Sequence, residues 1–342
     1  MSRPDPRGER FERVVERMEE LEVDALFLSH GADLPWLTGY RAMPLERLTL
    51  LVLRARGEPL LLVPELEAPR VPDGHNLFAT HPWKDTQDPI ALTLEVLGNS
   101  STGKIAVSDR MWASSLLALQ KAIPDATWTA ASSVMSRLRA VKDNEEIEVL
   151  REAASAADRV ASALQYGQIS LIGRTEAEVS DEIGRRLIEE GHQSVNFAIV
   201  GSGPNGASPH HEAGTRRIGP GEVVVCDFGG TMAIPGLAAG VGYCSDITRT
   251  VVTGEPDTEI REIYEVLVSA QRAGVESARA RTSAEDVDGA ARSLIERAGL
   301  GDRFIHRTGH GIGIEEHEDP YLVGGNATPL EIGNAFSVEP GI

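Results

Sequence analysis

The chain has 342 residues, of which 41% are hydrophobic and 25% are charged. This length exceeds what one hydrophobic core usually organises, and the composition excludes a disordered, collagen-like or coiled-coil chain. The formal net charge of −19 repels phosphate backbones and anionic membrane surfaces, so we expect neither nucleic acid nor a membrane as a partner.

The first part of the chain mixes helical patterns with short apolar runs. Apolar residues recur at helical spacing from Glu9 to about Glu22. Strand-like runs then follow at 25–28, 48–53, 60–63 and 105–107, with helices expected at 92–97 and 116–123. This order predicts an α/β layer domain, which we place at residues 1–132. None of its residues forms a recognisable catalytic cluster.

The second part of the chain is dominated by longer helices. Asp143 with Glu146, and Thr175 with Glu178, have capping-box spacing and predict helices that run to about residues 164 and 190. Further helices are expected at 257–279 and 283–298, with strands at 195–200, 222–228, 243–252 and 334–338. These elements predict a second, mixed domain over residues 133–342.

Two cysteines, Cys226 and Cys244, cannot form a disulfide framework. Cys244 is two residues from Asp246 and on a strand would point to the same face as that aspartate. Cys226 is adjacent to Asp227 and would point to the opposite face, which disfavours a bridge between the two cysteines. The N-terminal segment lacks an apolar signal core, and the longest aliphatic stretches fall short of a membrane span. We expect a cytoplasmic protein.

Two aspartates lie within strand-like apolar sequence in the second half. Asp227 ends the run VVVCD, and Asp246 lies in GYCSDITRTVV. A buried carboxylate needs a cation, backbone donors or a proton, because leaving it unpaired costs several kcal/mol. Either aspartate alone would more often cap a turn or form a salt bridge.

A histidine and a glutamate near the end of the chain narrow these alternatives. His310 lies in HRTGHGIG, where glycines allow close approach of the backbone to a bulky group, and Glu339 lies in SVEPG. Together with the two aspartates they form a hard oxygen and nitrogen ligand set that suits Mn²⁺, Fe²⁺, Co²⁺ or Zn²⁺. Three carboxylates suit two dications better than one, which is the outline of a hydrolytic site.

The motifs that carry these residues resemble a known family. The segments GSGPNGASPHHE, VVVCDFGG, GYCSDITRT, HRTGHGIGIEEHEDPY and SVEPGI occur in the order seen in the Xaa-Pro peptidases, aminopeptidase P and prolidase, of the M24-like pita-bread metallopeptidases. LPWLTGYR and RAVKDNEEIEVLREAA resemble the N-terminal domain of that family and its junction, so the resemblance extends over the whole chain.

The resemblance implies both a fold and an activity. The fold is an α/β N-terminal domain, of the creatinase N-terminal or ribonuclease H-like type, followed by an α+β pita-bread catalytic domain. The implied activity is hydrolysis of the peptide bond that precedes proline, in dipeptides or at the N-terminus of short peptides. It also implies a homodimer and two divalent metal ions, with Mn²⁺ preferred and Co²⁺, Zn²⁺ or Fe²⁺ as alternatives.

The same resemblance assigns the metal ligands. Asp227 would bind one metal ion and Asp246 would bridge both. His310 and Glu339 would bind the other ion, and Glu339 would also shuttle a proton from the nucleophilic water.

Two further histidines match positions that contact substrate in the family. These are His210 in SPHHE and His317 in EEHEDP, which would stabilise the oxygen that becomes negative during attack. For His211 and His306 we expect a structural role instead.

The sequence departs from the family pattern in two places. Asp227 and Asp246 lie nineteen positions apart. The family spacing is shorter, so about eight residues within TMAIPGLAAG are an insertion, which a connecting turn tolerates at modest entropic cost. In addition, the family continues beyond Glu-Pro-Gly with a strand that carries a second bridging glutamate. We expect a chain ending at Ile342 to be a truncated form that binds metal more weakly and has less activity than an extended one.

Two alternative functions remain open from the sequence. One is a metal-independent, creatinase-like hydrolase of a small carbon–nitrogen substrate, although retention of both aspartates argues against it. The other is a non-catalytic pseudo-peptidase whose cleft serves for binding, and the absence of the final glutamate supports it.

Overall fold

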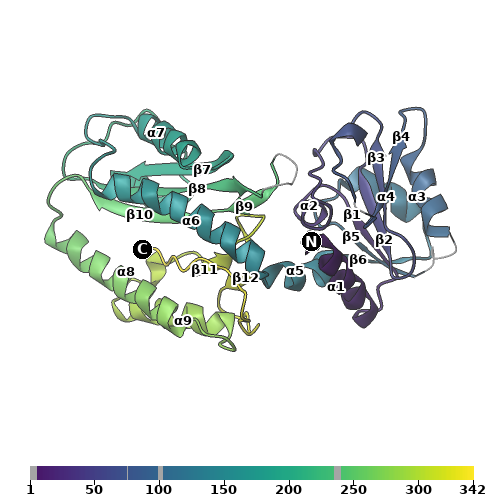
Figure 1. Ribbon diagram of the computed structural model, residues 1–342. Coiled ribbons are helices and arrows are strands. Elements are labelled where there is room, and N and C mark those ends of the chain that lie inside the picture. The colour runs from purple at the N-terminus through teal and green to yellow at the C-terminus, as the bar shows by residue number, and fades with distance from the viewer. Residues whose placement is uncertain (1–5, 75, 99–102, 235–239) are drawn as a thin grey trace. The chain divides into compact units, whose positions relative to one another are not determined.

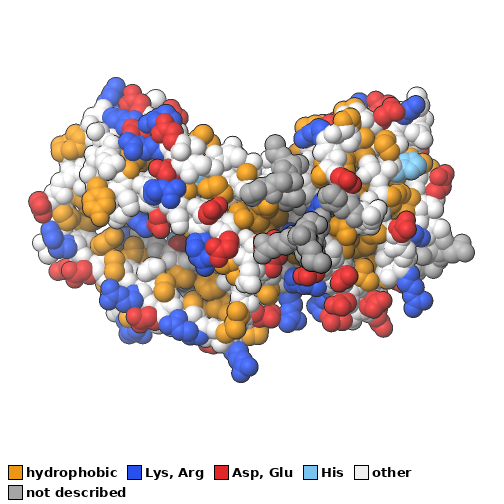
Figure 2. Space-filling model, in the orientation of Figure 1, with side chains coloured by type: hydrophobic (Ala, Val, Ile, Leu, Met, Phe, Trp, Pro, Cys, Tyr) orange, Lys and Arg blue, Asp and Glu red, His pale blue; other side chains and the backbone are white. Residues whose placement is uncertain are grey.

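A computed structural model describes all residues of the chain except 1–5, 75, 99–102 and 235–239. The chain forms two compact units. The first contains the residues up to Arg139 and a short segment that ends at Val241, and the second contains the other residues from Ala140 onwards. Within the described residues, none of the helices is both long and apolar enough to cross a membrane. Figure 2 shows acidic and basic side chains interspersed on the visible face of both units.

The first unit is built on a six-stranded mixed sheet in the order β4-β3-β2-β1-β5-β6 (Figure 1). Strand β1 pairs antiparallel with β2 and parallel with β5. The bounds of the strands are β1 Ala25–Leu28, β2 Leu50–Arg54, β3 Leu60–Pro64, β4 Ala79–Trp83, β5 Lys104–Val107 and β6 Thr127–Ala130. The structure therefore confirms the four expected strands and adds β4 and β6, which the sequence did not predict.

Helices complete the first unit. Their bounds are α1 Pro6–Glu20, α2 Asp33–Thr38, α3 Pro89–Leu97, α4 Ala113–Ala122 and α5 Ser132–Ala140, with a 3-10 turn at Ala68–Arg70. Leu97 of α3 and Leu119 of α4 join Phe27 and Ile105 of the sheet in one hydrophobic core, because burial of these side chains removes apolar surface from water. Three of the helices were expected from the sequence, whereas α2 and α5 were not.

Capping boxes begin two of the helices of the second unit. Helix α6 spans Asn144–Gln165, and Asp143 and Glu146 exchange side-chain-to-backbone hydrogen bonds at its start. Thr175 and Glu178 do the same for α7, Glu176–Glu189. Each pair satisfies two backbone donors that a helix start leaves free. Helices α8, Thr258–Ser277, and α9, Ala284–Arg297, pack against each other (Figure 1).

The sheet of the second unit contains β7, Ser194–Ser202, β8, Val223–Ala233, and β10, Ile247–Val252, in the order β10-β8-β7. Helix α6 packs on β8 and β10, and α7 packs on β7 (Figure 1). Val224, Cys226 and Phe228 of β8 point into the core beneath these helices. Since neighbouring strand residues point to opposite faces, Asp227 faces away from that core.

The strand expected at 243–252 is interrupted. It forms β9, Gly242–Cys244, which pairs with the end of β8, and β10, which pairs with the part of β8 around Asp227. Ser245 and Asp246 lie between the two strands. The prediction of one continuous strand was wrong, because hydrophobic periodicity does not show where backbone pairing with the neighbouring strand is interrupted.

The prediction of a strand at 334–338 was also wrong, since this segment forms isolated bridges and no regular strand. It lies beside β11, Gly309–Gly311, which pairs with β12, Glu318–Leu322. Three backbone hydrogen bonds connect it to the β11 region, including those from Ser337 N–H to the His310 carbonyl and from Glu339 N–H to the Thr308 carbonyl. These partners are distant in sequence, so local pattern could not define the pairing.

A buried carboxylate connects α9 to the start of β11. Asp288 accepts hydrogen bonds from Arg292 and from both the hydroxyl and the backbone N–H of Thr308. Burial alone would raise the pKa of Asp288, but the hydrogen bonds from Arg292 and Thr308 outweigh it and lower the pKa. The ionised carboxylate is therefore stabilised in the folded protein.

We expect Asp288→Asn to lower the free energy of unfolding at pH 7 by about 2 to 3 kcal/mol, because charge-assisted hydrogen bonds are lost. A depressed pKa contributes stability above the ordinary aspartate pKa, and this contribution is lost as pH falls through the folded value. Urea unfolding of both proteins from pH 7 to pH 3 should therefore show the difference shrinking with acid. A difference that stays constant with pH would contradict this account.

Candidate metal centre

Asp227 and Asp246 are brought together by strand pairing around β8. Thr248 of β10 lies opposite Asp227 in the register, and its hydroxyl donates a hydrogen bond of 2.8 Å to Asp227 Oδ1. Asp246 comes two residues before Thr248, at the break between β9 and β10. The sheet thus presents both carboxylates on the side away from the α6 and α7 core.

A close backbone approach determines where Asp246 lies. A Cβ atom at Gly229 would come within 2.0 Å of the Ser245 carbonyl oxygen, so only glycine fits there. The Ser245 hydroxyl accepts a hydrogen bond from Gly230 N–H and lies 2.8 Å from Nε2 of buried His192. The His192 Nδ1 lies 3.1 Å from the Leu187 carbonyl oxygen. When His192 Nδ1–H donates to that carbonyl, His192 Nε2 accepts a hydrogen bond from the Ser245 hydroxyl. This bond holds Ser245, the residue before Asp246, in place.

His310 and His317 come from the hairpin of β11 and β12. Their ring centroids are 4.0 Å apart, and the side chain of His310 is only 4% exposed. His310 Nδ1 lies 3.0 Å from the Gly311 carbonyl oxygen, which leaves Nε2 directed at the carboxylates. A buried imidazole held through Nδ1 and open at Nε2 is suited to bind a metal ion.

Glu339 reaches the same place along the irregular segment beside β11. A Cβ atom at Gly309 would lie 2.0 Å from the Ser337 carbonyl oxygen, so this glycine allows the segment to approach. The Ser337 hydroxyl donates a hydrogen bond to Glu339 Oε1 at 3.0 Å and accepts one from the backbone N–H of His310 at 3.1 Å. Ser337 therefore orients the glutamate carboxylate toward His310.

The four candidate ligands converge, namely Asp227, Asp246, His310 and Glu339. His310 Nε2 lies 3.0 Å from Glu339 Oε1 and 3.4 Å from Asp246 Oδ2. Ligand atoms of Asp246, His310 and His317 all lie within 4.8 Å of one another, which is the spacing of a potential metal site. Asp227 lies close enough for the charges of Asp246 and Glu339 to act on it.

The electrostatics of this cluster indicate a need for positive charge. Burial and then the neighbouring charge of Asp246 raise the pKa of Asp227. Burial lowers the pKa of His310, but hydrogen bonds to Asp246 and Glu339 outweigh it and raise the pKa to about 10. Burial alone would raise the pKa of Glu339, but the hydrogen bond with His310 outweighs it, so the pKa of Glu339 lies below its usual range. A cationic imidazole thus balances part of the carboxylate charge, as bound cations would.

His317 is exposed and borders the cluster. Burial of part of its ring, then the positive charges of His310 and Arg307, lower the pKa of His317. The neutral imidazole is therefore favoured at this position, and it can still donate an N–H to an oxygen that becomes negative.

The remaining histidines of interest lie in other surroundings. His210 is exposed in a turn, and none of the described residues forms a hydrogen bond with its side chain. The neighbouring His211 is bound to the buried carboxylate of Glu176 at 2.8 Å. His306 packs edge-on against Phe304 and lies 2.7 Å from the Arg307 carbonyl oxygen. The structure therefore brings His317 to the cluster and leaves His210 outside the group of converging ligand atoms.

Three supporting residues were missed by sequence reasoning. They are His192, Thr248 and Ser337. Thr248 and Ser337 each lie two residues from a candidate ligand, so alternation along an extended chain could have pointed to them. His192 had no such signal, because its partner Ser245 is far away in sequence.

Both cysteines are free and buried. The Cys244 thiol contacts Asn196, Thr231 and the Ile314 carbonyl oxygen rather than the converging ligands. Burial raises the pKa of both thiols to about 12. The insertion predicted between the aspartates overlaps residues 235–239 and lies partly outside the described residues, while β8 continues to Ala233.

Comparison with known proteins shows which family the chain belongs to. Residues 148–342 match the metallopeptidase family M24, and residues 10–141 match the Creatinase/Prolidase N-terminal domain. A probable dipeptidase PepE of Mycobacterium tuberculosis is 43% identical over 320 residues, which cover 93% of this chain and 82% of that protein. An Xaa-Pro dipeptidase of Lactobacillus helveticus is 34% identical over 338 residues, covering 97% and 89% respectively.

A solved structure agrees with these matches. The crystal structure of dipeptidase PepE from Mycobacterium ulcerans superposes with a TM-score of 0.89 at 40% identity, covering 98% of this chain and 88% of that one. The resemblance drawn from the motifs is confirmed, as is the combination of a creatinase-type N-terminal domain with a pita-bread catalytic domain. The chain therefore belongs to the metallopeptidase family M24 and carries its Creatinase/Prolidase N-terminal domain.

Proposed function

We propose that this protein hydrolyses the peptide bond that precedes proline, in dipeptides or at the N-terminus of short peptides. The observation that carries the proposal is the convergence of His310 with Asp246 and Glu339 beside Asp227. Relatives that bear the names dipeptidase and Xaa-Pro dipeptidase support the substrate class.

The residues of the cluster fit a pair of divalent ions. Asp227 would hold one ion, Asp246 would bridge both, and His310 with Glu339 would hold the other. Carboxylate oxygens and an imidazole nitrogen are the ligands that Mn²⁺ and its neighbours prefer, and we propose Mn²⁺ as the native metal, with Co²⁺, Zn²⁺ or Fe²⁺ as alternatives. The raised pKa of Asp227 supports this fit, since the crowded carboxylates would be stabilised by added positive charge.

The chain's own side chains would then carry out the proton transfers and charge stabilisation. When bound, the two metal ions would polarise the scissile carbonyl and make a water more acidic. Glu339 is oriented by Ser337 and would accept the proton of the attacking water and deliver it to the leaving nitrogen. His317, at the edge of the cluster, would donate an N–H to the oxygen that becomes negative, and His210 would assist from its loop.

An activity assay with metal control tests the proposal. Protein loaded with Mn²⁺ or Co²⁺ should cleave Xaa-Pro dipeptides, lose activity on chelation, and regain it when the metal is restored. Dipeptides without proline in the second position serve as the specificity control. Elemental analysis should find bound metal ions, which distinguishes the proposed peptidase from a metal-independent, creatinase-like hydrolase. Xaa-Pro peptides that survive incubation with the metal-loaded, full-length protein would contradict the proposal and favour a binding function.

The hydrogen bond from Thr248 to Asp227 should matter for metal binding. We expect Thr248→Val, which keeps the shape of the side chain, to weaken metal affinity about 10-fold, because partners that orient a ligand typically contribute that much. Titration with Mn²⁺ followed by calorimetry measures the change. Thr250→Val, two residues along β10, is the matched control and should leave the affinity unchanged, whereas equal affinities for the wild type and Thr248→Val would exclude this role.

We further propose a cytoplasmic homodimer with a domain boundary at residues 132/133. The two buried free thiols support a reducing compartment. The dimer rests on the family resemblance and is tested by the solution mass. Limited proteolysis followed by mass spectrometry of the fragments tests the boundary.

A further inference from the structure

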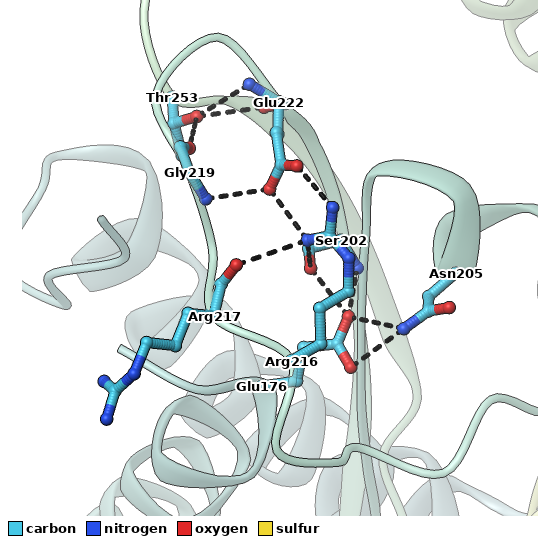
Figure 3. A network of polar contacts seen from close by, with 8 residues as sticks. All are labelled: Glu176, Ser202, Asn205, Arg216, Arg217, Gly219, Glu222 and Thr253. Carbon is cyan, nitrogen blue, oxygen red and sulfur yellow. Dashed lines mark hydrogen bonds and ion pairs between the residues drawn. The ribbon is translucent and has the colours of Figure 1, made fainter. Parts of the chain in front are cut away.

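Outside the proposed metal centre, the buried carboxylate of Glu176 accepts hydrogen bonds from several partners. Glu176 is the first residue of α7, and its side chain is 0% exposed. Its Oε1 accepts hydrogen bonds from the backbone N–H of Ser202 at 2.8 Å and from the Ser202 hydroxyl at 2.6 Å. Asn205 donates to both carboxylate oxygens, at 3.0 and 3.1 Å, and His211 Nε2 lies 2.8 Å from Oε2 (Figure 3 shows the Ser202 and Asn205 partners).

These partners all lie in one segment, residues 202–211, which consists of the end of β7 and the loop that follows it. Ser202 is the last residue of β7, Asn205 lies in the 3-10 turn Gly203–Ala207, and His211 follows four residues after that turn. Between Asn205 and His211 lies His210, the exposed histidine that resembles a substrate-contacting residue of the family. A single buried carboxylate therefore anchors the loop on both sides of His210.

The anchor is itself connected to the strand that carries Asp227. In β7, Ile199 is the register partner of Asp227, three residues before Ser202. Arg216 donates to the Ser202 hydroxyl oxygen at 2.6 Å and pairs with Glu222, next to the first residue of β8 (Figure 3). Glu222 also accepts from Gly219 N–H at 2.8 Å, which fixes the chain that enters β8. The loop is thus held in a defined place relative to the candidate metal ligands.

The charge of Glu176 persists over the working pH range. Burial alone would raise its pKa, but the hydrogen bonds from Ser202, His211 and Asn205 lower it to about 2. The carboxylate is therefore an acceptor for all of its partners at neutral pH. A neutral amide in its place would present an NH₂ group to at least one donor and leave that donor unpaired.

We propose that Glu176 is a positioning residue, whose carboxylate holds the loop 202–211 so that the His210 imidazole can reach the substrate. This inference rests on the proposed function, and in particular on the proposed role of His210. Glu176 touches neither the substrate nor the metal ligands in this account. Its effect on the reaction passes entirely through His210.

A double-mutant cycle tests this dependence. Glu176→Gln and His210→Ala should each lower kcat/KM for an Xaa-Pro dipeptide, by about 30-fold or more, because small displacements of a stabilising group are costly. The loss should lie mainly in kcat, and metal content should stay at the wild-type value. In the His210→Ala background, Glu176→Gln should cause little further loss, since the group that it positions is gone.

A matched control separates positioning from general damage to α7. Glu182 lies on the same helix, is largely buried, and pairs with Arg174 and Arg186 rather than with the loop. Glu182→Gln should keep wild-type kcat/KM and metal content. If Glu176→Gln does not fold, Asn205→Ala removes two of the hydrogen bonds to the carboxylate and should show a smaller, equally non-additive loss with His210→Ala.

Hydrogen exchange supplies a readout that does not depend on activity. Glu176→Gln should accelerate amide exchange in residues 203–211 while the amides of β8 and β10 keep their protection. The inference is overturned if exchange in this loop is unchanged, or if Glu176→Gln costs the same factor with and without His210. A metal-loaded wild type that fails to cleave Xaa-Pro dipeptides would instead overturn the proposed function, and the exchange result would still decide whether Glu176 anchors the loop.

Discussion

Asp246→Ala should abolish peptidase activity, with a loss in kcat/KM of at least about 1,000-fold. Asp246 lies 3.4 Å from His310 Nε2 and is the residue that the proposal places between the two metal ions. Its removal takes away one carboxylate of three and the one ligand that both ions would share. Elemental analysis of the purified variant should therefore show a loss of bound metal together with the loss of activity.

The control for this prediction is Asp181→Ala, an exposed aspartate on α7. It changes the net charge equally and should keep both metal and activity. Thermal unfolding of the metal-free proteins should show that Asp246→Ala is folded. An Asp246→Ala protein that retains two metal ions and wild-type kcat would remove this residue from the metal centre.

His317→Ala should lower kcat by about 100- to 1,000-fold, which is the usual cost of removing a donor to a developing oxyanion. The ring of His317 lies 4.0 Å from that of His310 and is exposed, so it is available to a substrate. Because His317 is proposed to contact substrate rather than to hold an ion, metal content should stay unchanged. Steady-state kinetics at saturating metal measures the effect.

The matched control is His81→Ala, an exposed histidine of β4 in the first unit. This variant should match the wild type in kcat and metal content. A His317→Ala protein that loses metal in parallel with activity would instead make His317 a ligand. Unchanged kcat would exclude it from the reaction.

The elements that the sequence predicted best are those with local signals. The capping boxes Asp143–Glu146 and Thr175–Glu178 marked the starts of α6 and α7, because each pair satisfies backbone donors within four residues. The buried strand β1 followed from its continuous apolar run, and burial on both faces removes any need for alternation.

The elements that the sequence missed depend on distant partners. Strand β6, at the edge of the first sheet, is partly exposed and has no apolar run, and it exists because β5 offers a parallel neighbour. The break at Ser245 and Asp246 depends on Gly229 in the adjacent strand and on His192 beyond it. Neither contact can be predicted from the hydrophobic periodicity of the neighbouring residues.

The candidate site followed from motifs rather than from periodicity. The donor types of Asp227, Asp246, His310 and Glu339 suggested a metal centre, and the family resemblance supplied their roles. The structure adds the distances, and it adds the supporting hydrogen bonds of Thr248 and Ser337. For His210, the structure shows an exposed side chain in an anchored loop, a position that the motif alone could not describe.

Anomalous diffraction from crystals grown in saturating Mn²⁺ is the most direct test of the proposed metal centre. The account predicts two manganese peaks in the second unit, with Asp246 between them, Asp227 beside one, and His310 with Glu339 beside the other. Crystals without manganese at these side chains, or with manganese bound only elsewhere on the chain, would contradict it.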